Sequence, residues 1–140
     1  MIVLGVVVFL TISIGLARFL TTENVERDAV QGLLSAQARG DENAVLASLS
    51  GCRATTSCVA TVHANVTQLR RAGAVKIISL MSTTAYSLTG ATGRTRVAWE
   101  VAGSLPVVQC VLVRRHGNAV SGVSISLLAL SRPISNTGDC

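Results

Sequence analysis

The sequence predicts an α+β fold, in which helices come first along the chain and antiparallel strands follow. Two observations favour this class. Apolar residues recur at helical spacing up to about residue 72, and with a period of two from about residue 75 onward. Helices followed by a run of strands are typical of a sheet that is covered on one face. We therefore expect an N-terminal transmembrane helix and then about three helices packed on a curved antiparallel sheet of about four strands.

The composition limits the classes of protein to which the chain can belong. The chain has 140 residues, of which 49% are hydrophobic and 14% are charged. These fractions exclude a disordered protein, a coiled coil and a charged nucleic-acid tail. The length fits one domain behind an N-terminal segment.

The N-terminal segment is apolar enough to suggest a membrane anchor. The run 1–17 contains no charged side chain. A helix through Leu20 would be about 30 Å long, which matches the hydrocarbon thickness of a bilayer. We expect residues 1–20 to form a transmembrane anchor or uncleaved signal, and residues 21–140 to form an extracytoplasmic domain. Signal cleavage after Ala17 stays open, because Gly15 and Ala17 place small residues at the −3 and −1 positions, and it would yield a secreted protein.

Four cysteines follow the apolar segment. They are Cys52, Cys58, Cys110 and Cys140. An even number of cysteines in an exported chain indicates disulfides, and among three pairings we predict Cys52–Cys58 and Cys110–Cys140. The loops that these bonds close would stabilise the fold by about 2.4 and about 3.7 kcal/mol. A zinc site is disfavoured because no CxxC pair exists, and we predict no metal and no cofactor.

Three helical segments are expected after residue 20. The first covers 22–39 and ends at Gly40, which suits the left-handed residue after a helix. Asp41 is placed to cap a second, short helix. A third helix is expected from Val59, with Arg70 and Arg71 in its last turn.

The remainder reads as an antiparallel meander. Runs with a period of two cover 75–88, 94–101, 107–115 and 121–131, and turns are expected at 89–93, 103–106 and 116–118. In the second run, Thr95, Val97 and Trp99 face one side of the sheet, and Arg94 and Arg96 face the other. In the last run, one face is expected to carry Val123, Ile125, Leu127 and Ala129.

The order of these elements resembles a known superfamily. A long helix, the junction "ARGDENAVLASL", a third helix and four long strands are similar to the nuclear transport factor 2-like (SnoaL-like, cystatin-like) cone fold over residues 22–133. With a single span ahead of that domain, the chain is similar to small Mce-associated and secretion-core proteins of bacteria. The resemblance implies a cone-like sheet and a binding or assembly module of the bacterial cell envelope. The alternative that it implies is a small-molecule-binding protein or SnoaL-like enzyme that uses the cone cavity.

The sequence lacks the motifs and residue pairs that would favour an enzyme. Enzymes of that superfamily line the cone with acidic and histidine residues, and in this chain only Glu100 lies in the β-rich runs. His63 and His116 have no carboxylate or nucleophile close to them in sequence. The chain has no G-x-S-x-G, Walker or H-E-x-x-H motif. We predict no catalytic residues.

Charge gives the leading candidate site. Residues 21–50 carry a net charge of −3, and residues 51–138 carry +8. Arginine side chains suit phosphate and carboxylate, so a candidate anion-binding face is formed by Arg94, Arg96, Arg114 and Arg115. Nucleic acid is disfavoured by the compartment and by the scarcity of aromatic side chains. The expected partners are the lipid bilayer, through residues 1–20, and an envelope protein or a second copy of this chain. We expect the protein at the cell membrane, with its C-terminal domain outside the cytoplasm.

Overall fold

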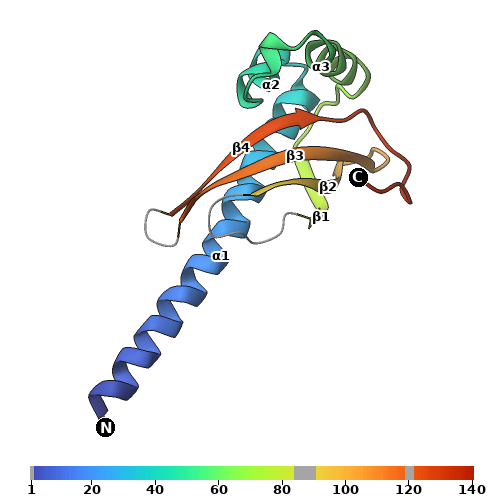
Figure 1. The fold of residues 1–140 in the computed structure, drawn as a ribbon. Coiled ribbons are helices and arrows are strands. Elements are labelled where there is room, and N and C mark those ends of the chain that lie inside the picture. Colours follow the sequence, from blue (N-terminus) through green and yellow to red (C-terminus); the bar gives the residue numbers. More distant parts are fainter. Residues whose placement is uncertain (1, 84–90, 119–121) are drawn as a thin grey trace.

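The α+β class, with helices first and an antiparallel meander after them, is confirmed. The computed structural model describes residues 2–83, 91–118 and 122–140 (Figure 1). Its helices are α1 (Ile2–Arg39), α2 (Glu42–Ser48), the 3-10 helix η1 (Cys52–Ala54) and α3 (Thr56–Gln68). Its strands are β1 (Val75–Ser82), β2 (Ala91–Val101), β3 (Val107–Asn118) and β4 (Gly122–Leu130), paired in the order β1-β2-β3-β4.

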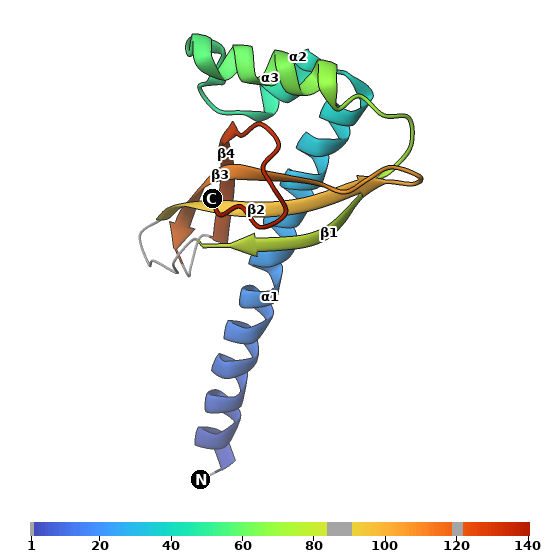
Figure 2. The ribbon, with the colours of Figure 1, turned by 90° about the vertical axis from the view of Figure 1, so that its right-hand side faces the viewer.

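The sheet curves around the C-terminal half of α1. Figures 1 and 2 show α1 crossing one face of the sheet, with α2 and α3 at the end of the molecule farthest from the N-terminus. We call the face that packs against α1 the inner face and the opposite one the outer face. The N-terminal half of α1 extends well beyond the sheet.

The two halves of α1 differ in what surrounds their side chains. In the C-terminal half, one stripe is completely or almost completely buried, namely Glu26, Val30, Leu33, Leu34 and Gln37. Between residues 6 and 14 the large apolar side chains are exposed, from 50% for Val8 to 69% for Phe9. Nowhere in the described ranges does a helix combine the length and the apolar character that crossing a membrane requires.

The start and end signals around α2 are confirmed. Gly40 has a φ of 80°, the left-handed conformation that ends α1. The Asp41 side chain accepts a hydrogen bond of 3.0 Å from the main-chain N–H of Ala44, which is the expected N-cap contact. The tight turn between α1 and α2 therefore has local causes.

The end of α3 was predicted wrongly. The helix stops at Gln68, so Arg70 and Arg71 lie beyond it rather than in its last turn. The reason is tertiary: the main-chain N–H of Arg71 donates 2.8 Å to the carbonyl of Ala38, which draws the chain toward α1.

Two of the predicted turns were also wrong in part. Residues 91–93 belong to β2 and pair with Arg115, Arg114 and Val113, and residues 116–118 belong to β3 and pair with β4. Pairing with a neighbouring strand outweighs the turn preference of the local glycines. The rest of the first turn, residues 89–90, lies outside the described residues, as do residues 84–88 of the first expected strand and residue 121 of the last one.

The alternation of β4 also departs from the prediction. The register shifts between Leu112 and Val113, which pair with Ala129 and Leu127, so Leu128 is an extra residue. Because of this shift, Leu127 and Leu130 are buried whereas Ala129 is only half-buried. The Val123 side chain lies outside the described part of the chain. The predicted alternation of β2 is confirmed, since Thr95, Val97 and Trp99 are fully buried.

Candidate functional site

Both disulfides form with the predicted pairing. Cys52–Cys58 joins η1 to the first turn of α3, and Cys110–Cys140 joins β3 to the last residue of the sequence. No cysteine is free. Two disulfides in a domain of this size fit an extracytoplasmic or secreted protein.

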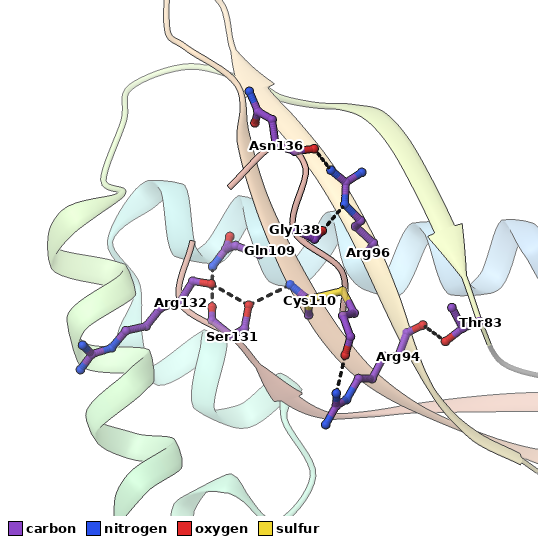
Figure 3. The surroundings of a disulfide bond; sticks show 10 residues. Thr83, Arg94, Arg96, Gln109, Cys110, Ser131, Arg132, Asn136 and Gly138 are labelled. Carbon is purple, nitrogen blue, oxygen red and sulfur yellow. Dashed lines mark hydrogen bonds between the residues drawn. A yellow bond between two sulfur atoms is a disulfide. The ribbon is translucent and has the colours of Figure 1, made fainter. Parts of the chain in front are cut away.

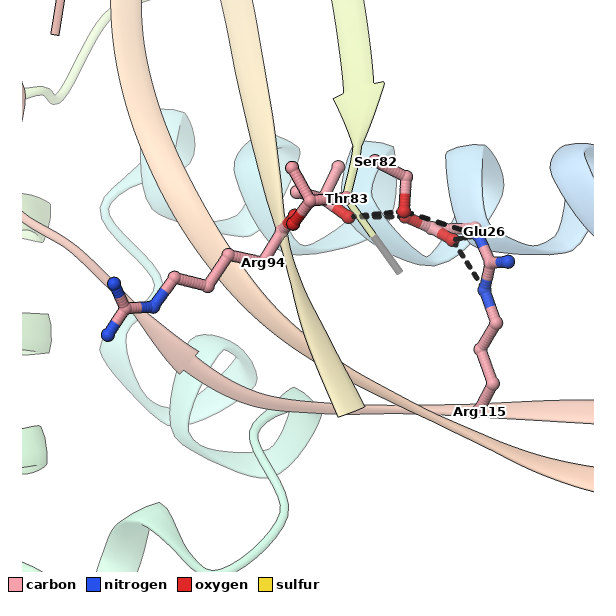
Figure 4. A network of polar contacts seen from close by, with 6 residues as sticks. Glu26, Ser82, Thr83, Arg94 and Arg115 are labelled. Atoms are coloured by element: carbon pink, nitrogen blue, oxygen red, sulfur yellow. Dashed lines mark hydrogen bonds and ion pairs between the residues drawn. The ribbon is translucent and has the colours of Figure 1, made fainter. Parts of the chain in front are cut away.

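The four arginines of the predicted anion-binding face do not share one face. Arg94 and Arg96 lie on the outer face, and the pairing of Thr92 with Arg114 puts Arg114 on the same side. Arg115 follows Arg114 directly and therefore points to the inner face, where it is 9% exposed. Figure 4 shows the Arg94 and Arg115 side chains extending away from each other. The candidate face is thus reduced to three arginines.

Two of those three arginines bind the C-terminal segment of the chain. We call residues 132–140 the strap. The Arg96 side chain donates to the carbonyls of Asn136 and of Gly138, the latter at 3.1 Å, and Arg94 donates to the main-chain oxygen of Cys140 (Figure 3). The arginines that sequence reasoning offered to an external anion therefore contact backbone carbonyls of the same chain.

Arg115 takes part in a buried ion pair on the inner face. Its guanidinium donates two hydrogen bonds to Glu26 Oε2, one of them from Nε at 3.1 Å, and Thr95 Oγ1 donates 2.5 Å to Glu26 Oε1 (Figure 4). Ser82 Oγ lies 3.3 Å from Arg115. Glu26 is 1% exposed, so α1 is attached to the sheet by a pair of charges that are nearly out of contact with water.

A second polar network lies three helical turns farther along α1. Gln109 Oε1 accepts from Gln37 Nε2 at 3.0 Å and from Trp99 Nε1 at 2.9 Å. Gln109 Nε2 and Asn65 Nδ2 both donate 2.9 Å to the carbonyl of Ser131. These residues join α1, α3, β2 and β3 to Ser131, which directly precedes the strap, and the neutral amides supply donors and acceptors to one another.

The inner face is filled by these networks and by apolar side chains. Val30, Leu33 and Leu34 of α1 are fully buried against the sheet. Two hollows are lined by described residues. One, of about 360 Å³, is lined by η1, α3 and β4, and the other, of about 300 Å³, lies between the sheet and the strap.

The histidines are on the surface and far apart in the chain. His63 Nδ1 lies 3.0 Å from Glu42 Oε2, which joins α3 to α2, and the histidine side chain is 70% exposed. His116 is exposed on β3. Within residues 2–83, 91–118 and 122–140 no group of acidic, histidine and cysteine side chains is arranged to hold a metal ion.

Sequence reasoning missed the buried polar residues, although a signal was present. Glu26 and Gln37 are eleven residues apart, or three helical turns, and lie on the same stripe as Val30 and Leu33. Gln109 interrupts the apolar run 107–113 at a position that faces the core. A polar residue within an apolar stripe indicates a buried partner, and the sequence does not say which one.

The fold and these contacts define a disulfide-bonded α+β domain on a long helix. No family model, curated protein or solved structure matches the chain.

Proposed function

We propose that this protein is a non-catalytic binding or assembly module of a bacterial cell envelope, held at a membrane by residues 1–20 with its α+β domain outside the cytoplasm. The observation that carries the proposal is the combination of an oxidised domain with an apolar, exposed helix that extends from it. The resemblance of the sequence to nuclear transport factor 2-like domains behind a single membrane span is part of this proposal. That resemblance also suggests the bacterial source.

Membrane attachment follows from the cost of exposing the N-terminal half of α1 to water. Val6, Phe9 and Ile12 are more than half exposed, and charged side chains are absent from residues 1–17. Burying apolar surface is worth about 25 cal/mol per Å², so an apolar environment around this half of α1 is strongly favoured. A bilayer supplies that environment, and Glu26, the first buried side chain among those described in α1, comes after residue 20.

A binding or assembly role follows from how the polar side chains are used. The inner-face polar groups bond to one another, with Glu26 to Arg115 and Gln37 to Gln109. This leaves the outer face and the ends of the domain to meet a partner. An envelope protein or a second copy of the chain is the partner class that this arrangement suits.

Cell fractionation with protease accessibility tests the proposal. In intact bacteria that express the native gene, we expect the chain in the membrane fraction, with its domain cleaved by protease added outside the cytoplasmic membrane. Its four cysteines should resist alkylation until a reductant is added. A cytosolic chain with four alkylatable thiols would contradict the proposal.

The intact mass of the isolated protein separates anchoring from secretion. An anchored protein retains residues 1–17, whereas cleavage after Ala17 removes them and yields a protein in the soluble extracytoplasmic fraction. The mass of the detergent-solubilised particle then distinguishes a second copy from a different partner.

A further inference from the structure

The strap has little structure of its own and covers part of the outer face. Figure 2 shows it on the side of the sheet opposite α1. Its one strand-like contact is the bridge between Val108 and Ile134, where the Ile134 N–H donates 2.8 Å to the Val108 carbonyl. Most of its residues are exposed. Its position therefore depends on a few identifiable contacts.

Besides the Ile134–Val108 bridge, those contacts are one disulfide and three arginine hydrogen bonds. Cys140 is bonded to Cys110 on β3, and Arg94 and Arg96 donate to three main-chain oxygens of the strap (Figure 3). The two oxygens that Arg96 contacts are neutral peptide carbonyls, and a neutral carbonyl is the weaker partner for a guanidinium, because a hydrogen bond between two charged groups is about twice as strong. A phosphate or carboxylate that reached Arg96 would therefore compete well with the strap.

The strap also carries a charge that opposes such a ligand. A hollow of about 300 Å³ lies beneath it, and the lining includes Arg94, Cys110, Asp139 and Cys140. Asp139 belongs to the strap, so its carboxylate repels an incoming anion while the strap is in place. Removing the strap frees the guanidinium donors and removes this negative charge at the same time.

The three outer-face arginines suit a ligand with more than one anionic group. Arg94 and Arg96 are two residues apart on β2, which places their Cα atoms about 7 Å apart on one face. Arg114 is opposite Thr92 on the neighbouring strand, diagonal to Arg94. Phosphate groups joined in one molecule, or held at a surface, can contact several of these guanidiniums together.

We propose that the strap is a removable cover over a polyphosphate-binding site formed by Arg94, Arg96 and Arg114, and that the Cys110–Cys140 bond keeps it closed. The cover opens by thiol–disulfide exchange with a dithiol: the Cys110–Cys140 S–S bond breaks, both sulfurs become thiols, and the dithiol is oxidised to its own disulfide. The ligand is either a soluble pyrophosphate compound or the phosphates of a lipid surface. The inference deepens the proposed function by naming a ligand class, and it does not depend on membrane attachment.

The first experiment tests, in the full-length wild-type protein, whether ligand binding favours opening of the strap. A ligand that binds only the open form must favour opening. In detergent, at a fixed ratio of reduced to oxidised dithiol, adding pyrophosphate should raise the fraction of alkylated Cys140 at least threefold. The Cys52–Cys58 bond in the same molecule is the internal control and should not respond. An unchanged fraction of alkylated Cys140 would overturn the proposal.

The second experiment measures binding directly by calorimetry. The variant Cys110→Ser with Cys140→Ser should bind pyrophosphate at least tenfold more tightly than the oxidised wild type. Arg94→Gln or Arg96→Gln in that background should abolish the gain, whereas Arg53→Gln, which changes a distant basic residue, should not. Equal affinity with and without the strap bond, or a gain that survives both arginine substitutions, would overturn it. If this variant does not fold, the wild-type alkylation result decides.

Vesicles distinguish the two sources of phosphate. Anionic phospholipid vesicles that raise Cys140 alkylation while neutral phosphatidylcholine vesicles do not would indicate a lipid surface. A response to pyrophosphate alone would indicate a soluble ligand. Because these measurements use purified protein, they can contradict the strap proposal while fractionation still finds the chain at the membrane. A chain that fractionates elsewhere would likewise leave the strap proposal unaffected.

Discussion

Glu26 and Arg115 form a buried charge pair, and removing one partner should lower the free energy of unfolding more than removing both. Glu26→Met leaves the Arg115 guanidinium buried without an anion, so the free energy of unfolding should fall by about 3–5 kcal/mol. Urea denaturation in mild detergent measures it. Replacing both residues by Met should recover most of the loss, because two apolar side chains of similar volume leave no buried charge without a partner.

A matched control for this pair is available on the same helix. Asp28 is exposed, so Asp28→Asn should change the free energy of unfolding by no more than about 0.5 kcal/mol. A double Met variant that is as unstable as Glu26→Met would contradict the assignment of the loss to an unpaired charge.

Gln109 is the residue on which the second network converges. Gln109→Leu removes the acceptor for Trp99 Nε1 and Gln37 Nε2, and each donor left buried without a partner costs about 1–3 kcal/mol. Trp99 is the only tryptophan, so its fluorescence reports on this site during denaturation. The exposed Gln68→Leu is the matched substitution and should be nearly neutral. Equal stability of the two variants would refute the role given to Gln109.

At the scale of elements, α2 depends on its cap because it is only seven residues long. Asp41→Ala removes the acceptor for the Ala44 N–H, and we expect the free energy of unfolding to fall by about 1 kcal/mol. Asp41→Asn keeps an acceptor oxygen and should retain most of the stability. Thermal unfolding of the three proteins side by side gives the comparison, and a loss of equal size in both variants would mean that charge rather than capping is responsible.

At the scale of the whole molecule, the two disulfides should contribute unequally. The bond between Cys110 and Cys140 closes a longer loop than the bond between Cys52 and Cys58, with sequence separations of 30 and 6. Replacing the longer pair by serines should cost about 3.7 kcal/mol and replacing the shorter pair about 2.4 kcal/mol. Denaturant unfolding of the two double variants measures the order, and the reverse order would show that native contacts outweigh loop entropy.

Features that depend on neighbouring residues could be predicted from the amino-acid sequence. Asp41 and Gly40 gave the correct helix junction, because capping and left-handed conformations are local properties. Apolar spacing predicted the alternation of β2, since side-chain direction repeats with the period of the strand. The even number of cysteines predicted two disulfides.

Contacts between residues of different elements became known only from the folded structure. It placed 91–93 in a strand rather than a turn, because β3 supplies hydrogen-bond partners that the local sequence does not show. It separated Arg115 from Arg94 and paired it with Glu26, 89 residues away. It also put the strap on Arg94 and Arg96. Contacts between distant segments depend on strand register and helix position, and these are set by packing of the whole core rather than by any stretch of the chain.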